Sequence, residues 1–116
     1  MAVPMLSLSD RGDQQMCVFC DIQADKKVQE NEHFFAIYDT RPVSRGHILI
    51  ISKRHVESFF DLTDDEGPSL LEMSNTCRRM LEDKFGPTGY NIAINNGRSA
   101  GQTISHFHLH IIPRYG

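Results

Sequence analysis

The residues of this chain that are best suited to chemistry form one row near its C-terminal end. From Ser105 to Ile112 the sequence reads SHFHLHII, so His106, His108 and His110 alternate with apolar residues. Successive side chains of a β-strand point to opposite faces, so a strand here places the three imidazoles on one face and the apolar residues in a core. The alternative is a histidine-rich polar face without a function, and it is disfavoured because histidine is an uncommon residue.

The spacing of the row limits the chemistry that its histidines can share. At about 3.3 Å per residue, neighbouring imidazoles start about 6.6 Å apart and the outer two about 13 Å apart. A metal-bound imidazole needs its nitrogen about 2.0–2.1 Å from the ion. Two of the histidines can therefore share a metal ion, but all three cannot easily do so. At least one is expected to be free for another role.

A pair of cysteines is the second group of interest. Cys17 and Cys20 are separated by two residues, and Cys77 stands alone. An odd number of cysteines fits poorly with a disulfide framework, and a close pair in a reducing compartment more often serves metal or redox chemistry. A redox dithiol requires a strand before Cys17, and none is expected there. Zinc is therefore favoured, although the pair alone needs two further ligands.

A sheet and one long helix are the elements that must position these groups. Apolar and aromatic runs bounded by turn residues predict strands, at residues 28–30, 33–38, 47–51, 90–95 and 103–113. A turn or short helix is expected around residues 56–60. Because the strands are separated from the helix along the chain, we expect an α+β domain, with an antiparallel sheet of about five strands, one long helix and one short helix.

The long helix is marked by its ends and by one apolar stripe. It begins either at the capping box of Thr63 and Glu66 or near Gly67, and it ends at Gly86. The stripe at helical spacing is expected to face the sheet, and it consists of Leu70, Leu71, Ser74, Cys77, Leu81 and Phe85. Cys77 is then a small core residue rather than a reactive thiol.

Length and charge exclude several classes of protein. A chain of 116 residues makes one domain, which we place at residues 17–116 after a flexible N-terminal lead of residues 1–16. The net charge of -3 argues against nucleic-acid binding through a basic surface. The N-terminus lacks the features of a secretory signal, and no apolar run approaches the roughly 20 residues of a membrane span. We expect a cytoplasmic protein with neither a nucleic-acid nor a membrane partner.

Several motifs together resemble one known family. The run from His106 to Ile112 matches the signature of the histidine triad (HIT) family, in which three histidines alternate with apolar residues. Residues 95–103 resemble the nucleotide-binding loop of that family, residues 45–50 its upstream histidine strand, and Asp39-Thr40 its ribose-contacting turn. The resemblance extends from Cys17 to Arg114 and is closest to the bacterial and Hint-like branches. It implies a nucleotide hydrolase or transferase that acts at the α-phosphorus.

The resemblance assigns the catalytic roles, and the chemistry of imidazole agrees with them. A neutral imidazole, with an ordinary pKa of about 6.5, is a good nucleophile near neutral pH, and a covalent intermediate divides a difficult displacement into two steps. His108 matches the nucleophile of the family. His110 and His47 are implied to lie against the phosphate, where they stabilise developing charge. No catalytic metal is required at the phosphate by this interpretation.

The substrate implied is a purine nucleotide, with the adenosine type favoured. Gly97 and Gly101 allow backbone N–H groups to approach phosphate oxygens closely. The family's ribose, phosphate and base contacts correspond in this chain to Asp39, Thr40, Phe19, Ile22, Ile37, Asn95, Gly101, Gln102 and Thr103. Without the resemblance, we would interpret Phe19, Ile22 and Ile37 as ordinary core residues.

In zinc-containing members of the family, the remaining metal ligands resemble His55 and His106. Together with Cys17 and Cys20 they make a Cys2His2 set without an open position, which is typical of structural zinc. The histidine row then divides, with His106 on the metal and the other two on substrate. The family also implies a homodimer whose sheets join across an extended interface.

Three functions compete at this stage. The leading hypothesis is hydrolysis of nucleoside phosphoramidates or dinucleoside polyphosphates through a nucleotidyl-His108 intermediate. The second is a non-catalytic, dimeric nucleotide-binding adaptor, which the complete set of three histidines disfavours. The third is a metalloenzyme that uses the histidine row directly, and it would need further ligands that the few residues after Ile112 do not supply.

Overall fold

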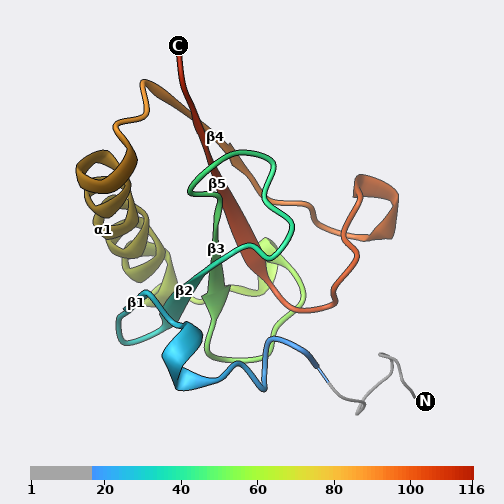
Figure 1. Ribbon diagram of the computed structural model, residues 1–116. Helices are drawn as coiled ribbons and strands as arrows, with labels where there is room; N and C mark the ends of the chain where they lie inside the picture. The colour runs from blue at the N-terminus through green and yellow to red at the C-terminus, as the bar shows by residue number, and fades with distance from the viewer. Residues whose placement is uncertain (1–16) are drawn as a thin grey trace.

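A five-stranded antiparallel sheet with one long helix across one face forms the domain (Figure 1). The computed structural model describes residues 17–116, so the N-terminal lead expected at residues 1–16 lies outside the described residues. The strands lie in the order β1-β2-β3-β5-β4, and their bounds are β1 (Gln29–Glu30), β2 (Phe34–Tyr38), β3 (Ile48–Ser52), β4 (Gly89–Ala93) and β5 (His108–Arg114). The long helix α1 spans Glu66–Phe85, and 3-10 turns occupy Ala24–Lys26, Phe59–Asp61 and Arg98–Ala100. The expected α+β architecture is confirmed.

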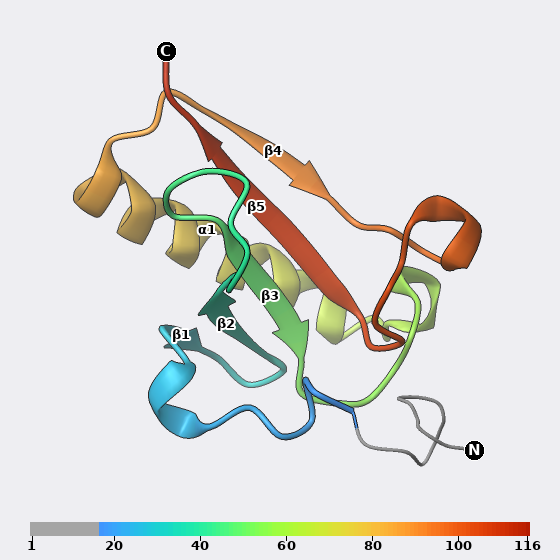
Figure 2. The ribbon, with the colours of Figure 1, turned by 45° about the vertical axis from the view of Figure 1, so that its right-hand side comes forward.

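The main core lies between the sheet and α1, which runs across the back of the sheet in Figure 2. Alternate residues of the three central strands point toward the helix, among them Phe34, Ile50 and Leu109, and all three are buried. From the helix they meet Leu70, Met73, Cys77 and Leu81. No helix in the described part of the chain is long and apolar enough to cross a membrane.

One residue that was expected on the buried stripe of the helix, Leu71, does not face the sheet. Leu71 is 65% exposed, whereas Met73 is only 1% exposed and packs in the core. Residues on a helix advance by about 100° each, so a face centred on Leu70, Met73 and Cys77 turns Leu71 away from the sheet. The burial of Cys77 at 0% exposure agrees with the core role expected for it.

The ends of α1 follow the expected signals. The side chain of Glu66 accepts a hydrogen bond from the Thr63 N–H at 2.8 Å, and the Thr63 hydroxyl accepts one from the Glu66 N–H at 3.3 Å. This reciprocal pair is a capping box. At the other end Gly86 adopts a left-handed conformation with φ of 62°, which terminates the helix.

The second face of the sheet carries a smaller apolar cluster and the histidines. Phe35, Ile37, Leu49 and Ile51 point away from the helix and pack against Phe19 of the N-terminal segment. Strand β5 places Leu109 toward α1. The expected alternation along this strand is therefore present.

Strand β5 is shorter than expected, because it begins at His108 instead of Thr103. The last pair of the β3–β5 ladder is Ile51 with His108, since β3 ends at Ser52. Beyond that pair, the Ser52 N–H reaches the Phe107 carbonyl only at 3.5 Å. The Phe107 N–H instead donates to the Val56 carbonyl at 2.6 Å. His106 consequently lies in a bend before the strand.

Candidate active site

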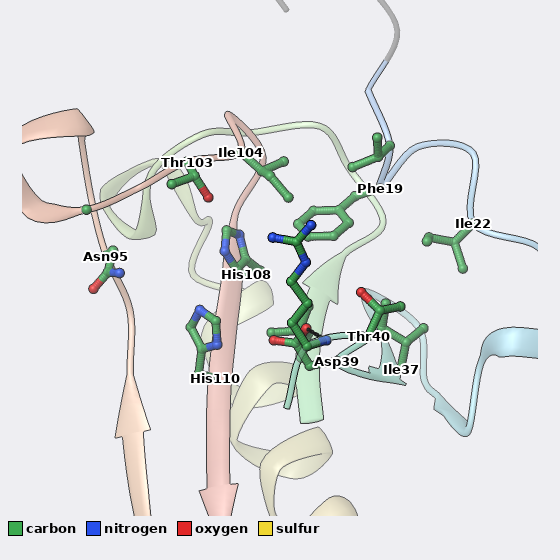
Figure 3. A pocket seen from close by; sticks show the side chains of 14 residues that line it. Phe19, Ile22, Ile37, Asp39, Thr40, Asn95, Thr103, Ile104, His108 and His110 are labelled. Atoms are coloured by element: carbon green, nitrogen blue, oxygen red, sulfur yellow. Dashed lines mark hydrogen bonds between the residues drawn. The ribbon is translucent and has the colours of Figure 1, made fainter. Parts of the chain in front are cut away.

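A cavity of about 490 Å³ lies over the β2, β3 and β5 side of the sheet that faces away from α1. Figure 3 shows His108 and His110 side by side on β5, with Asn95 to one side and Phe19, Ile22 and Ile37 to the other. The cavity is therefore polar at one end and apolar at the other. Its lining consists of Val18, Phe19, Ile22, Ile37, Asp39, Thr40, Arg41, Leu49, Asn95, Gly101, Thr103, Ile104, His108 and His110.

Most of the residues expected to bind substrate line this cavity, and two expected residues do not. His47 lies behind His110, to which it is hydrogen-bonded. Gln102 uses its amide within the protein: its Nε2 donates to the Glu57 and Ile104 carbonyls, and its Oε1 accepts from the Gly97 N–H. Its side chain therefore holds the glycine loop in shape, and the expected contact of Gln102 with the phosphate or leaving group stays a prediction.

Four lining residues were missed by the sequence reasoning, namely Val18, Arg41, Leu49 and Ile104. Two of them had a signal in the sequence. Val18 stands between the two cysteines, and Arg41 follows the turn of Asp39 and Thr40 directly. Leu49 and Ile104 read as ordinary apolar residues, and only the packing of the segments brings them to the cavity.

The hydrogen bonds of His108 leave one ring nitrogen available for reaction. Nδ1 lies 2.8 Å from the main-chain oxygen of His106, which can only accept, so Nδ1 carries the proton and donates it. In the neutral imidazole Nε2 then holds a free lone pair. The ring is 8% exposed, and Phe19 packs edge-on against it with ring centres 5.0 Å apart. The hydrogen bond to the His106 carbonyl and the contact with Phe19 thus fix the orientation of the His108 imidazole.

A chain of hydrogen bonds also defines the protonation of His47 and His110. The Val43 N–H donates to His47 Nδ1 at 3.1 Å, so the proton of neutral His47 is on Nε2. Nε2 lies 3.0 Å from His110 Nδ1 and donates to it. The Nε2 of His110 then carries its proton. Burial lowers the pKa of both His47 and His110 below the ordinary value of 6.5, which keeps this chain neutral at pH 7.

Asp39 joins this chain at the polar end of the cavity. Its Oδ2 lies 3.5 Å from His47 Nε2, and its Oδ1 accepts a hydrogen bond from the Arg41 N–H at 2.9 Å. Asp39, His47 and His110 stand close enough together to suggest a metal site. The Val43 N–H opposes it, because Nδ1 of His47 would have to carry the proton before Nε2 could offer a lone pair to an ion.

Gly101 in the loop after β4 is the one lining glycine. Its φ is 95°, in the left-handed region that side chains avoid. A Cβ added there would also stand 3.3 Å from the Asn95 side-chain nitrogen. Glycine at position 101 therefore suits both this backbone conformation and the close approach to Asn95.

Beside the cavity lies a second cluster of possible metal ligands, which consists of Cys17, Cys20, His55 and His106. Cys17 and His106 are 89 residues apart in the sequence. Sγ of Cys17 is 3.2 Å from Nδ1 of His106, Sγ of Cys20 is 3.2 Å from Nδ1 of His55, and the two Nδ1 atoms are 3.0 Å apart. Tetrahedral zinc with bonds of about 2.0–2.3 Å holds its ligand atoms about 3.3–3.8 Å apart. The four donors can therefore hold a zinc ion.

The protonation of this cluster also suits a metal. Nε2 of His106 donates to the Ser52 carbonyl at 2.7 Å, which leaves Nδ1 with its lone pair directed at the cysteines. Burial lowers the pKa of His106 to about 4, so the ring is neutral. Burial and the neighbouring Cys17 raise the pKa of the Cys20 thiol to about 12, so a bound metal ion would have to displace its proton.

A sheet of this topology, with a histidine row facing a cavity and an upstream histidine hydrogen-bonded to it, defines a histidine triad protein. Comparison with known families agrees, since the HIT domain matches residues 22–116. The chain belongs to the HIT domain family. It is 41% identical over 104 residues to the protein named hit of Bacillus subtilis, a match that covers 86% of this chain and 72% of that protein.

Three further relatives have more specific descriptions. The adenosine 5'-monophosphoramidase hnt1 of Schizosaccharomyces pombe is 34% identical, over 84% of this chain and 74% of its own length. A diadenosine triphosphate hydrolase of Plasmodium falciparum superimposes with a TM-score of 0.76 at 29% identity, over 80% of this chain and 63% of that one. A zinc-bound histidine triad protein of Mycobacterium smegmatis does so with a TM-score of 0.76 at 36% identity, over 86% and 76% respectively. Nucleotide hydrolases thus occur among the relatives.

Proposed function

We propose that this protein is a nucleotide hydrolase that transfers an adenosine-type nucleotidyl group to His108 and then to water. The observation that carries the proposal is the hydrogen bond from His108 Nδ1 to the His106 carbonyl, because it leaves Nε2 free as a nucleophile at the cavity wall. The relatives named as a phosphoramidase and a diadenosine triphosphate hydrolase support the same reaction class.

The two ends of the cavity suit the two ends of a nucleotide. The apolar end, with Phe19, Ile22 and Ile37, fits a purine base, and the carboxylate of Asp39 fits the ribose hydroxyls. Asn95 and Thr103 stand with the histidines at the polar end, where the phosphate belongs. This assignment leaves the α-phosphorus over Nε2 of His108.

The reaction proceeds in two displacements. First, Nε2 of His108 forms a bond to the α-phosphorus, while the bond from phosphorus to the leaving group breaks and the leaving group keeps the electron pair. The Nε2–H of His110 donates its proton to a leaving amine, or a hydrogen bond to a leaving phosphate oxygen. Second, water attacks phosphorus and the bond to His108 breaks, with its electron pair returning to Nε2. The proton that water releases passes to His110 where a leaving amine has taken the His110 proton, and to solvent where the leaving group was a phosphate.

We further propose that Cys17, Cys20, His55 and His106 bind one structural zinc ion, as the zinc-bound relative suggests. Bound zinc would cross-link the N-terminal segment to the sheet without taking part in the reaction. A catalytic metal held by the whole histidine row has no support, because His106 belongs to this cluster whereas His108 and His110 line the cavity.

We propose that two copies of the chain form a homodimer through the edge strand β4. The expected cytoplasmic location stays a prediction. Among residues 17–116, strand β4 pairs only with β5, and Ile92 on it is 63% exposed. An unpaired edge with an exposed apolar residue is a template for a second strand. Sedimentation should give a dimer, and Ile92→Lys should give monomers; a monomeric wild-type protein contradicts this.

The decisive experiment is capture of the covalent intermediate. Wild-type protein mixed with diadenosine triphosphate or adenosine 5'-phosphoramidate and quenched at alkaline pH, where phosphorus–nitrogen bonds to histidine persist, should gain the mass of one adenylyl group on the peptide that contains His108. His108→Ala should show neither the adduct nor turnover, but should keep its fold and bind AMP. Near-normal turnover by His108→Ala would contradict the mechanism, and binding without turnover by the wild type would favour the non-catalytic adaptor.

A further inference from the structure

Arg41 is the one arginine or lysine among the residues that line the cavity. Its main chain is held at the cavity edge, because its N–H donates to Oδ1 of Asp39 at 2.9 Å and because Pro42 restricts the residue before it. Its side chain is exposed. A cationic side chain is thus tethered at a fixed point beside the site.

The guanidinium of Arg41 has no partner within the described part of the chain. Other arginines are engaged: Arg54 forms two hydrogen bonds to Glu66, and Arg114 donates to Asn91. Among residues 17–116, no hydrogen bond or ion pair joins the Arg41 side chain to another group, and only its N–H is used. The guanidinium is therefore available to a ligand.

The anchor of Arg41 lies at the histidine end of the cavity. Asp39, which holds it, is 3.5 Å from Nε2 of His47, and His47 is hydrogen-bonded to His110. The apolar wall of Val18 and Phe19 belongs to a different segment, the loop between the cysteines. Asp39 is assigned to the ribose, so a side chain as long as that of arginine, rooted two residues later, can reach past the ribose to the phosphates.

Arg41 is the one lining residue that is always positively charged and can therefore offset the charge of phosphates. The lining contains one carboxylate, Asp39, and burial lowers the pKa of His110, so that ring is neutral near pH 7. A chain of phosphates brings several negative charges into this space. Guanidinium is the side chain best suited to them, since it is always charged and binds phosphate through two parallel hydrogen bonds.

We propose that Arg41 binds the phosphate chain of the leaving group and makes the enzyme prefer leaving phosphates over leaving amines. This inference rests on the proposed function, because it concerns the leaving group of the same reaction. When the bond from α-phosphorus to the bridging oxygen breaks, that oxygen keeps the electron pair and the departing nucleoside polyphosphate gains one negative charge. Arg41 stabilises that charge. A leaving amine instead takes a proton from His110 and gains no negative charge.

The test compares two substrates that share the adenylyl group. Arg41→Gln should lower kcat/KM for diadenosine triphosphate by about tenfold to a hundredfold, the range of a charge-assisted hydrogen bond. It should change kcat/KM for adenosine 5'-phosphoramidate by no more than about twofold, a difference of about 0.4 kcal/mol. Arg41→Lys should restore part of the loss. Arg79→Gln is the control for net charge, because Arg79 is exposed on α1, away from the cavity lining.

Three results would overturn the proposal. An equal loss of kcat/KM with both substrates would show that Arg41 binds the nucleotide part that they share. Unchanged kinetics in Arg41→Gln would show that Arg41 has no role in the reaction. A matching loss in Arg79→Gln would show that the effect comes from net charge alone. Should the wild type hydrolyse neither substrate, the proposed function fails, and binding decides the inference separately. Calorimetry in a His108→Ala background should then show that Arg41→Gln weakens the binding of diadenosine triphosphate but not that of adenosine 5'-phosphoramidate. Equal changes in Kd for the two ligands would contradict the inference.

Discussion

The main-chain carbonyl of His106 accepts a 2.8 Å hydrogen bond from Nδ1 of His108. The imidazole of the same His106 lies 3.2 Å from Sγ of Cys17, inside the candidate metal cluster. One residue therefore connects the cluster to the reactive imidazole, through its side chain on one side and its carbonyl on the other. Phe19 adds a second connection, since it stands between the two cysteines and packs against both histidine rings at 5.7 and 5.0 Å.

Removal of the metal is expected to disturb both stability and nucleotide binding. Cys17→Ala should reduce zinc from about one ion per chain toward none. The melting temperature should fall, by about 4–8 °C for each kcal/mol lost. KM should rise more than kcat falls, because Phe19 forms part of the cavity wall. Metal analysis, thermal melting and steady-state kinetics measure the three effects.

The control for this variant is Cys77→Ala, because Cys77 is buried in the other core and belongs to neither site. It should keep its zinc and its KM while losing some stability. Full zinc content in Cys17→Ala, or no zinc in carefully purified wild type, would refute the metal assignment.

Replacement of His47 should act through His110 rather than on the substrate directly. His47→Asn removes the N–H that His110 Nδ1 accepts at 3.0 Å, so His110 is no longer held with its proton on Nε2. We expect kcat to fall by about tenfold to a hundredfold, at the lower end of the effect of a general acid. KM should change little, and the loss should be greater for a leaving amine, which needs the proton. A rise in KM alone would instead identify His47 as a binding residue.

The activity should depend on pH on the acid side. Burial lowers the pKa of His47 and His110 below 6.5, so both are neutral at pH 7. As pH falls through these lowered pKa values, protonation places a proton on His110 Nδ1 and breaks the chain of hydrogen bonds. A profile of kcat against pH should therefore be flat near neutrality and should fall only below pH 6.5. A fall that begins above this pH would contradict the neutral chain.

Among the carboxylates, Glu66 should contribute most to the free energy of unfolding. Arg54, together with the capping box, lowers the pKa of Glu66 to about 2 from 4.5. Because the folded state holds the lower pKa, this contribution is complete above about pH 4.5 and is lost as pH falls toward 2. Glu66→Gln should cost about 1–3 kcal/mol of unfolding free energy, measured by denaturant titration at pH 7.

Glu82→Gln is the matched control for Glu66, because the contacts of the Glu82 carboxylate with Arg78 and the Tyr90 hydroxyl are exposed and long, at 3.5 and 3.4 Å. Its replacement should cost no more than about 0.5 kcal/mol. Equal losses in the two variants would show that the buried network adds nothing specific to stability.

The sequence alone determined the sheet, the long helix and the limit on how many histidines of the row can share one metal ion. These features depend on local periodicity: alternation along residues 107–111, apolar runs in β2 and β3, and a capping box before α1. Side-chain direction follows from backbone geometry within one element, so it can be predicted before the elements are assembled. The distance limit on three successive histidines likewise required no tertiary information.

Which residues meet from different segments depends on how those segments pack against one another. Met73 rather than Leu71 faces the sheet because the orientation of α1 on it selects the buried face. Gln102 turns to the Glu57 carbonyl because that loop lies within hydrogen-bond reach. Strand β5 begins late because β3 ends at Ser52 and the Phe107 N–H donates to Val56 instead of to a strand. Each outcome depends on partners distant in the chain, and local sequence patterns carry no information about them.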